Sequence, residues 1–563
     1  MGTISDKLMR IINTKEDIRR ALISKGYDVP TSIPFKEYAK MISDLPCRVD
    51  SFPDIEGIVA RYSALGLTNE QMAANPVWVD KTGNGHDLQM KNFAWKEGSG
   101  ISDIYPGALV FDGVDDYGAC DNFPILTKEK GYTVVALRSY LAESIGYLVY
   151  NGTSAKQSAF AFERSDSLDT WSWGINSSIR NSLPKLMSYQ TSNSYNNNII
   201  STGTAIEGDK LIRIASDGGY CNVAIWELVF LDHDATEEEL TKIKDYFVKT
   251  YPWLFPDQAW TVTGKTNEDE DRATIANITG NGNNLVLSNF GFAEGSGYGL
   301  YAYNFNSFNL RDNVVKPTDV KKDSFRIIGT GNSSNLLILT NESDSANWKI
   351  RITGMKEGDS CIVGNANKSG DYIKIIKDGI YTFQKQYAAT SINGIWYNSS
   401  QEVDVLVEQI PEYEGYLITD GVDDKVQSSS FTMNEDWTIV GDWELLSNVQ
   451  INCGIVKAQN VYLYNTANGL LISINNPRSL QSFGTKSLHA ICSDGRLYDR
   501  NWVEYEYTVD QNFEIVESSL NIGFNLNNYT QIAFKNLGIY NNQILSKDDC
   551  IKAYNYLQTL KSK

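Results

Sequence analysis

Three carboxylates alternate with valines in the stretch Glu402-Val-Asp404-Val-Leu-Val-Glu408. On a β-strand these acids point to the same face, so they come into line. Retaining glycoside hydrolases use two such carboxylates, one as nucleophile and one as acid/base. The clean alternation with valine instead favours an outer strand whose acidic side faces solvent. We therefore predict that the chain is not an enzyme and assign no catalytic residue, with glycoside hydrolysis as the alternative.

A second group of carboxylates occurs twice, in the identical string Asp-Gly-Val-Asp-Asp at residues 112–116 and 420–424. The glycine after the first Asp predicts a tight turn that follows a buried strand. Clustered carboxylates are also the oxygen ligands that a hard cation such as Ca²⁺ prefers. A structural turn is the primary interpretation, and calcium is the cofactor to be tested. The candidate metal ligands are Asp112, Asp115 and Asp116 in the first string and Asp420, Asp423 and Asp424 in the second.

Aromatic residues in polar, loop-like surroundings suggest sugar binding, because glycans stack on aromatic faces and bind amides and carboxylates. Tyrosine, with 32 copies, leads the aromatic residues. Each single ring could instead belong to a core. The candidate glycan-binding residues are Trp171, Trp173, Trp396, Tyr397 and Trp502.

Composition argues against several other classes of function. The formal net charge is −19 and no basic stripe occurs, so we expect no nucleic-acid partner. No run of 18 apolar residues and no signal-peptide pattern occurs, so we expect neither membrane insertion nor export. Seven scattered Cys and three His give no zinc spacing and are typical of reduced thiols in a cytoplasm. Asp232-His233-Asp234 is interpreted as a polar loop or helix cap.

A duplication organises the elements that must position these residues. Thr82-Gly-Asn-Gly-His-Asp-Leu88 returns as Thr279-Gly-Asn-Gly-Asn-Asn-Leu285, and each copy precedes one of the Asp-Gly-Val-Asp-Asp strings. Between its two landmarks the second copy carries roughly 110 extra residues, about the size of a small domain. The sequence therefore predicts a β-domain that is duplicated and whose second copy is split by an insertion.

Short apolar runs between Gly, Asn, Ser and Asp clusters predict β-sandwiches, and an N-capped amphipathic helix is expected to close each copy. Helical spacing of apolar residues predicts short helices between residues 1 and 46. The predicted fold is mainly β. Its parts are a helical docking or oligomerisation segment at 1–50, a first sandwich at 51–255, a second at 256–299 plus 416–563, and an inserted small jelly-roll-like sandwich at 300–415.

The strings TGNGHDL with NFAW, and LVFDGVDDYG, followed by a final strand and ATEEEL, resemble the concanavalin A-like, laminin-G-like sandwich family. Domains of that family often bind calcium, which the resemblance implies for the Asp strings. The second copy departs from the pattern at Thr419 and Lys425, where the first has Phe111 and Tyr117. The stretch ExDxxxE at residues 402–408 is similar to a signature of one concanavalin-like hydrolase family.

The stretches at 66–85 and 264–282 resemble virion proteins of tailed phages of gut Bacteroides-type bacteria, including the crAss-like group. The opening residues are similar to N-terminal segments of phage fibre and collar proteins. The resemblance implies a head or tail fibre on the virion surface, made in the bacterial cytoplasm, which binds host surface glycans. It also implies a homo-oligomer, with a trimer expected from fibre practice, that docks on other virion proteins through residues 1–50. The alternatives are a tail-associated polysaccharide depolymerase and a non-binding capsid decoration or spacer.

Overall fold

The structure is a computed structural model, and it divides into two compact units, Met1–Glu56 with Thr236–Phe247, and Gly57–Ala235 with Val248–Lys563. The helices predicted between residues 1 and 46 lie outside the described residues. The structure describes residues 52–124, 126, 131–142, 146–152, 158–164, 185–190, 210–216, 219–292, 295–299, 309–311, 317–321, 324–329, 335–338, 347–365, 372–384, 393–410, 413–446, 453–458, 461–466, 469–474, 481–483, 488–507, 517–522, 524–525, 528–529 and 531–562.

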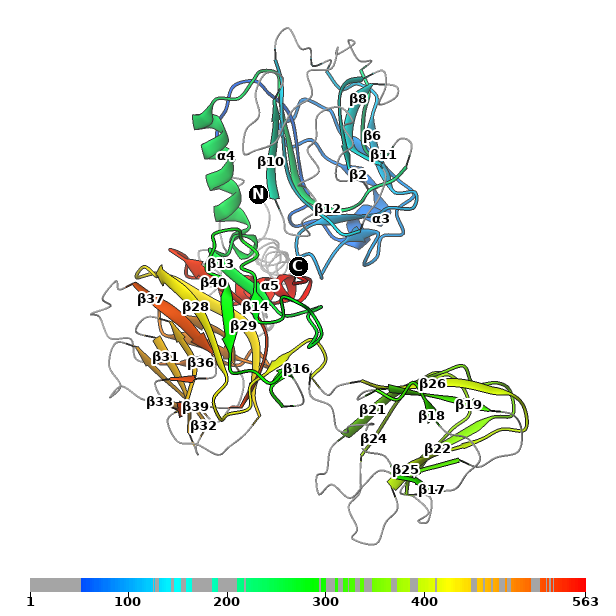
Figure 1. Cartoon of the computed structure of the whole chain (residues 1–563). Coiled ribbons are helices and arrows are strands. Elements are labelled where there is room, and N and C mark those ends of the chain that lie inside the picture. The colour runs from blue at the N-terminus through cyan, green and yellow to red at the C-terminus, as the bar shows by residue number, and fades with distance from the viewer. Residues whose placement is uncertain are drawn as a thin grey trace, which may run out of the picture. The chain divides into compact units, whose positions relative to one another are not determined.

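The described part of the first unit is residues 52–56 and most of helix α4 (Glu237–Thr250), the green helix in Figure 1. Thr236 and Glu239 form a capping box: the Glu239 N–H donates to Thr236 Oγ1, and the Thr236 N–H donates to Glu239 Oε2. The ring of Phe52 packs edge-on against Tyr246, with centroids 4.8 Å apart. The helix predicted from ATEEEL is thus confirmed. Its buried side chains are Leu240, Ile243, Tyr246 and Phe247.

The first sandwich consists of two six-stranded antiparallel sheets. One has the order β10-β7-β12-β5-β4, with β1 on β12; the other has the order β2-β3-β6-β11-β8-β9. The strands of the first sheet are β10 (Lys185–Gln190), β7 (Thr133–Tyr140), β12 (Asn222–Leu231), β5 (Leu109–Asp112), β4 (Gly100–Ile101) and β1 (Ile58–Ser63). Those of the second are β2 (Val77–Trp78), β3 (Leu88–Lys91), β6 (Tyr117–Cys120), β11 (Ile212–Ser216), β8 (Gly146–Gly152) and β9 (Ser158–Arg164), with helix α3 (Asn69–Ala74) before β2.

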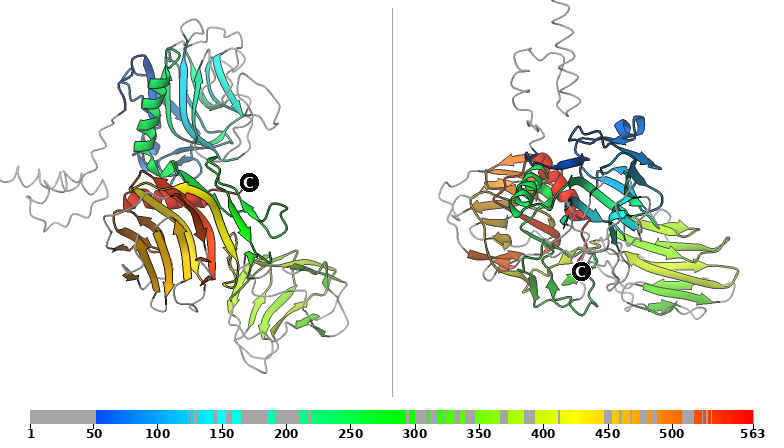
Figure 2. Two further views of the ribbon diagram at one scale, coloured as in Figure 1. Left: turned by 60° about the vertical axis from the view of Figure 1, so that its left-hand side comes forward. Right: turned by 90° about the horizontal axis from the view of Figure 1, so that it is seen from above.

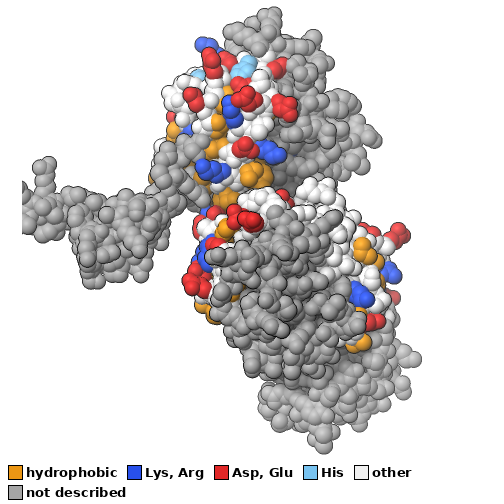
Figure 3. All heavy atoms as spheres, turned by 90° about the vertical axis from the view of Figure 1, so that its left-hand side faces the viewer, with side chains coloured by type: hydrophobic (Ala, Val, Ile, Leu, Met, Phe, Trp, Pro, Cys, Tyr) orange, Lys and Arg blue, Asp and Glu red, His pale blue; other side chains and the backbone are white. Residues whose placement is uncertain are grey.

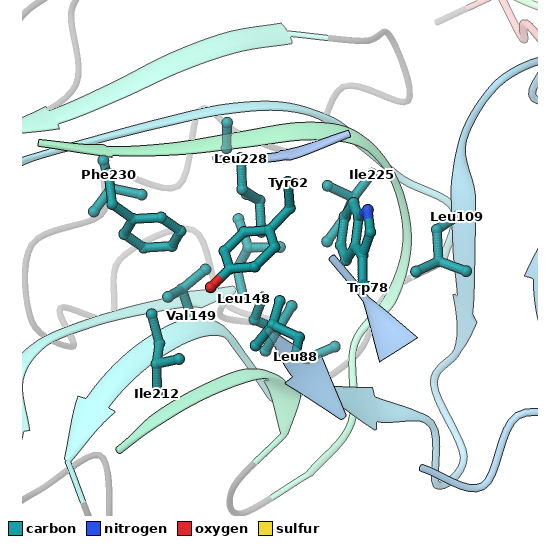
Figure 4. Packing of buried hydrophobic residues seen from close by; sticks show 14 of the residues in the cluster. Tyr62, Trp78, Leu88, Leu109, Leu148, Val149, Ile212, Ile225, Leu228 and Phe230 are labelled. Atoms are coloured by element: carbon teal, nitrogen blue, oxygen red, sulfur yellow. The ribbon is translucent and has the colours of Figure 1, made fainter. Parts of the chain in front are cut away.

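Both sheets of this sandwich contribute to one apolar core, which Figure 4 shows from close by. The ring of Tyr62 lies between Trp78 and Phe230, at centroid distances of 5.7 and 6.1 Å. Leu148 and Ile212 close the core from the second sheet. Burial of such side chains from two facing layers is the main stabilising contribution to a sandwich.

The second sandwich consists of two eight-stranded antiparallel sheets around an equivalent core. Their orders are β16-β27-β40-β29-β34-β35-β36, with β13 on β40, and β14-β15-β28-β37-β30-β31-β32-β33. Helix α5 (Lys547–Gln558) and the short 3₁₀ helix η3 (Pro252–Leu254) contact each other. The strands of the first sheet are β13 (Gln258–Thr261), β16 (Gly297–Tyr298), β27 (Leu417–Ile418), β29 (Trp437–Leu445), β34 (Leu488–Cys492), β35 (Arg496–Asp499), β36 (Glu504–Glu506) and β40 (Ile532–Asn541). Those of the second are β14 (Thr274–Ile275), β15 (Leu285–Ser288), β28 (Lys425–Thr432), β30 (Cys453–Ala458), β31 (Val461–Thr466), β32 (Gly469–Ile474), β33 (Gln481–Phe483) and β37 (Glu517–Ile522).

A third sandwich lies between the two halves of the second in sequence, and Figure 2 shows its yellow-green strands from two further sides. Its sheets have the orders β17-β20-β25-β22-β23 and β18-β19-β26-β21-β24. Both sheets bury side chains in a shared core. The strands are β17 (Asn309–Arg311), β18 (Pro317–Thr318), β19 (Ser324–Gly329), β20 (Asn335–Ile338), β21 (Asn347–Thr353), β22 (Ser360–Asn365), β23 (Tyr372–Ile375), β24 (Gly379–Gln384), β25 (Asn393–Asn398) and β26 (Val403–Ile410).

The chain leaves and re-enters the second sandwich at two paired strands. β16 pairs with β27, so that Gly297 lies opposite Ile418, and the Gly299 N–H donates to the Tyr416 carbonyl at 2.8 Å. The first copy has β4 paired with β5 at this place, and the Ser102 N–H donates to the Ala108 carbonyl at 3.1 Å. The third sandwich therefore occupies the position of a short loop in the first copy. The chain as a whole is a mainly β protein, as predicted.

Candidate functional site

The two Asp-Gly-Val-Asp-Asp strings form the same turn after strands β5 and β27. Asp112 Oδ1 accepts hydrogen bonds from three backbone N–H groups, those of Val114 at 2.7 Å, Asp115 at 3.2 Å and Asp116 at 3.4 Å. Asp420 Oδ1 accepts the corresponding three bonds in the second copy, with the same distances. Gly113 has φ of +76°, and a Cβ there would lie 2.8 Å from Asn222 Cβ. The predicted turn is confirmed, and glycine is required in it.

The last Asp of each string is buried and closes the turn from inside. Asp116 Oδ2 accepts from the Asp112 N–H at 3.0 Å, and Asp424 Oδ2 accepts from the Asp420 N–H at 2.8 Å. Ser296 Oγ also donates to Asp424 Oδ1 at 2.9 Å. Burial raises the pKa of both Asp116 and Asp424 to about 6.

The geometry of each Asp cluster bears on calcium. Within each group of three Asp residues, one ligand atom per residue lies within 4.8 Å of the others. However, one oxygen of the first Asp already accepts three N–H groups. The third Asp is buried, and one of its oxygens accepts the backbone N–H of the first Asp. The arrangement is that of a carboxylate that locks a turn, and calcium binding stays a prediction.

The glycine turns that precede these strings are also built alike. Asn84 Nδ2 donates to the Val59 carbonyl at 3.0 Å, and Asn281 Nδ2 donates to the Asp257 carbonyl at 2.8 Å. A second such pair, Asn92 and Asn289, has φ of +69° in both copies, and each Nδ2 donates to a carbonyl of the adjoining Asp string. The repeated polar residues thus position backbone segments. Their role is structural in both copies.

The three alternating carboxylates lie on the solvent face of β26. Asp404 binds the Arg326 guanidinium through both oxygens, at 2.7 and 3.3 Å, and Glu408 lies 3.6 Å from Arg351. Glu402 is exposed at the start of the strand. The valines between them are buried. The acidic side of β26 faces solvent, as the alternation predicted. Two of the acids form ion pairs with arginines on the neighbouring strands β19 and β21.

The predicted sugar-binding aromatics are distributed differently from one another. Trp171 and Trp173 lie outside the described residues. Trp396 lies on β25, where the structure describes the backbone only. Tyr397 is 1% exposed, belongs to the core of the third sandwich, and donates its hydroxyl to Asp359 Oδ2 at 2.6 Å. Because this ring is enclosed in the core, it offers no open face to a sugar.

Trp502 lies in a cluster of aromatic rings on the second sandwich. It sits in the turn between β35 and β36 and is half-buried. Its ring contacts His489 at 5.4 Å and Tyr554 at 5.7 Å between centroids, both edge to face. His489 stacks on Tyr554 at 4.1 Å, with the ring planes inclined by 20°. Strand β34, helix α5 and a turn thus bring three rings together.

Asp442 is the polar centre beneath these rings. It lies on β29 beside Trp443, which points into the core, so Asp442 points to the opposite face. Asp442 Oδ2 accepts from Tyr416 Oη at 2.8 Å, Gln558 Nε2 at 3.0 Å and Tyr554 Oη at 3.2 Å. Burial and the Asp442 charge raise the pKa values of both tyrosines, which keeps their hydroxyls as donors.

The backbone at Trp502 is strained and firmly held. Trp502 has φ of +58°, a conformation that bulky residues rarely adopt. Asp499 fixes it: its Oδ1 accepts from the N–H groups of Asn501 at 2.8 Å and Val503 at 2.9 Å, and its carbonyl accepts from the Trp502 N–H at 2.9 Å. Such strain persists where surrounding contacts over-determine it and is common at ligand sites. The indole is therefore presented in one orientation.

Charged groups border the aromatic cluster. Arg500 is exposed and its Nη1 lies 3.9 Å from Glu444 Oε1. Burial lowers the pKa of His489, and Arg500 adds to this while Asp442 and Asp499 oppose it. The ring of His489 is therefore favoured in its neutral form. The half-buried rings of Trp502 and Tyr554 can stack on a sugar, and the exposed guanidinium of Arg500 can hydrogen-bond its hydroxyls. We call Trp502, Tyr554, His489 and Asp442 the Trp502 cluster.

Sequence reasoning found only one member of this cluster. The polar surroundings of Trp502 indicate this residue from sequence, whereas Asp442, His489 and Tyr554 come from a strand, another strand and a helix that are far apart in the chain. No spacing rule connects them. Only their position on the outer face of one sheet, under α5, brings them together.

Surface charge, helix length and the cysteines bear on the other predicted properties of the chain. On the face shown in Figure 3, Lys and Arg side chains are interspersed with Asp and Glu. In the described part of the chain, no helix combines the length and apolar character needed to cross a membrane. Cys120, Cys361, Cys492 and Cys550 are free thiols, and they and Cys221 are buried, as predicted.

Comparisons with known proteins give a distant likeness in structure only. No family model matches the chain, and no curated protein matches it. It is similar to a solved binding domain of botulinum neurotoxin DC in complex with rat synaptotagmin II, at 10% identity and a TM-score of 0.27 over 85% of this chain and 99% of the other. A structure described as a receptor binding domain is similar at 9% identity and a TM-score of 0.25, over 85% of this chain and 97% of the other. The botulinum neurotoxin DC binding domain in complex with SialylT is similar at 8% identity and a TM-score of 0.23, over 87% of this chain and 99% of the other.

Proposed function

We propose that this chain is a non-enzymatic virion protein of a tailed phage, a head or tail fibre whose β-sandwiches attach to glycans of the host surface. The Trp502 cluster is the observation that carries the binding part of this proposal. It combines a fixed, half-buried indole with the half-buried ring of Tyr554, which Asp442 holds in place, and with the exposed guanidinium of Arg500. The virion part is supported by the resemblance of residues 1–50, 66–85 and 264–282 to phage proteins.

The ligand that suits this cluster is a sugar ring. An aromatic face covers the apolar side of a pyranose, and polar groups at the edge of the rings donate to or accept from its hydroxyls. The binding strength of one such site is modest. Several copies on one particle add avidity, so that millimolar single-site affinity suffices for attachment.

A glycan array probed with the full chain tests this proposal. We expect Trp502→Ala to lose at least about tenfold in affinity for any glycan that the wild type binds, since aromatic anchors dominate such interfaces. Trp502→Phe, which keeps a ring face, should retain part of it. Glu435→Gln, an exposed change on the same sandwich, is the matched control and should bind like wild type. Binding that is equal in all four proteins would overturn the site, and a blank array would favour the non-binding spacer.

The enzymatic alternative has its own test. Glu402→Gln and Glu408→Gln remove two of the three aligned carboxylates on β26. If the wild type cleaves no host polysaccharide, the depolymerase alternative fails. Cleavage that is lost in these two variants would establish it instead.

Assembly is proposed to run through residues 1–50. We expect light scattering to give an oligomer for the full chain and a monomer for a chain that starts at Ser51. The oligomer is expected to be a trimer, as is common for fibre proteins. A monomer in both cases would favour a decoration protein that docks on another virion protein.

A further inference from the structure

Arg138 is a charged residue inside the core of the first sandwich. It lies on β7, on the same face as Val134, Ala136 and Tyr140, which belong to the apolar core. The residue is 0% exposed. Among the described residues, none accepts a hydrogen bond from Nε, Nη1 or Nη2 of Arg138. An arginine side chain carries five N–H donors and a positive charge, so all of its polar capacity is unmatched here.

The neighbours of Arg138 in the sheet do not supply an acceptor either. β7 pairs with β10 and β12, which places Lys185 and Ile225 opposite Arg138. The guanidinium carbon lies 4.7 Å from the centroid of the Tyr140 ring. That cation–π contact is favourable, but it satisfies none of the N–H donors.

The duplicated sandwich shows that the fold does not need an arginine at this position. In the first copy, Arg138 follows the β-bulge of β12 and lies opposite Ile225. In the second copy, Trp443 follows the bulge of β40 and lies opposite Phe534. Trp443 is 1% exposed and is part of the core. An apolar ring thus fills the position that Arg138 holds in the first copy.

We propose that Arg138 anchors a binding site for a carboxylate between the sheets of the first sandwich. A buried charge without a partner is strongly unfavourable, and a carboxylate that accepts two parallel N–H bonds is the partner that the planar guanidinium fits best. A free carboxylate and the acid group of an acidic sugar share this chemistry. The site lies in another sandwich than the Trp502 cluster, and the inference does not rest on glycan binding there.

Thermal unfolding of the full chain tests this site. Sodium chloride is replaced stepwise by sodium acetate or by sodium glucuronate at constant ionic strength, and acetamide serves as the uncharged control. Ligand that binds only the folded state raises the unfolding midpoint. We expect a rise of about 3 °C or more at 100 mM carboxylate for the wild type, and none with acetamide.

Two variants make the result specific for Arg138. Arg138→Met removes the charge and keeps the stem, and Arg138→Trp introduces the residue that the second copy accommodates. Both should lose the response to carboxylate, and the tryptophan variant serves alone if the methionine variant does not fold. No rise in the wild type, or an equal rise in either variant, would overturn the proposal. A larger rise with glucuronate than with acetate would identify an acidic sugar as the source, and equal rises a free carboxylate.

Discussion

Trp502 packs edge-on against His489, with ring centroids 5.4 Å apart and ring planes inclined by 62°. His489 is itself stacked on Tyr554, and its Nδ1 is buried without a hydrogen-bond partner among the described residues. A proton on His489 would therefore place a charge against two rings and inside the sheet. The protonation state of one imidazole is linked in this way to the geometry of the Trp502 cluster.

Acidification is expected to destabilise the second sandwich through His489. Burial lowers the pKa of His489, with Asp442 and Asp499 opposing and Arg500 assisting. Because the pKa of His489 is lower in the folded protein than in the unfolded chain, neutral His489 contributes fully to the free energy of unfolding above the ordinary histidine pKa of about 6.5. This contribution is lost as the pH falls through the pKa that His489 has in the folded protein. We expect the midpoint of thermal unfolding, followed by tryptophan fluorescence, to fall by about 2–4 °C more between pH 7 and pH 5 in the wild type than in His489→Phe. An identical pH dependence in the two proteins would contradict this.

The Asp420 turn should depend on an acceptor oxygen and not on a charge. Asp420→Ala leaves three N–H groups without their common acceptor and should lower the free energy of unfolding by about 1–2 kcal/mol. Asp420→Asn keeps Oδ1 and should cost clearly less. The measurement is chemical unfolding of each variant with and without Ca²⁺. A stabilisation by Ca²⁺ that is present in the wild type and absent in Asp420→Asn would instead establish the calcium site.

Tyr397 is expected to contribute to stability and not to sugar binding. Tyr397→Phe removes the hydroxyl that donates to Asp359 Oδ2 inside the third sandwich and should lower its stability by about 1–2 kcal/mol. Glycan-array binding should match the wild type. A variant that unfolds normally but loses a glycan would contradict the core assignment.

The third sandwich should be removable. Replacing residues 299–416 by the sequence of residues 102–108 joins β16 to β27 as β4 is joined to β5. We expect the shortened protein to keep the second sandwich folded, because the paired strands on either side of the insertion are equivalent in the two copies. Protection of β29 and β40 amides in hydrogen exchange measures this. Loss of their protection would show that the second sandwich depends on the insertion.

Much of the fold follows from local pattern in the sequence. The alternating run at Val403–Val407 predicts β26 with its acids outside, and ATEEEL predicts the capped start of α4. The pairing of the strands does not follow from local pattern: β32 contains the apolar run Leu470-Leu-Ile472 after Asn468-Gly469, but nothing in this run identifies β31 and β33 as its partners. The departures at Thr419 and Lys425 also find local compensation: Thr419 Oγ1 accepts from the Ile532 N–H at 3.0 Å, and the Lys425 ammonium lies 5.9 Å from the Tyr529 ring centroid.

The candidate sites were less accessible from sequence. Tyr397 and Trp502 have similar polar neighbours in the chain, yet one ring is buried in a core and the other is half-exposed on a turn. Arg138 gives no signal in sequence, because a single arginine in an apolar run also fits an edge strand. Only the register against β12 shows that it replaces a core tryptophan. Long-range packing decides these cases, and periodicity does not report it.

The pairing of Gly297 with Ile418 also affects the order in which the chain folds. The ends of β16 and β27 are separated by roughly 120 residues of chain, and closing a loop of that length while it is unfolded has an entropic cost. A third sandwich that folds first shortens the effective loop, because its compact form holds the two ends within a small distance. During synthesis, the early strands of the second sandwich emerge before the insertion and lack their partners until it is complete. We therefore expect folding of the insertion to precede, and to speed, completion of the sandwich that surrounds it.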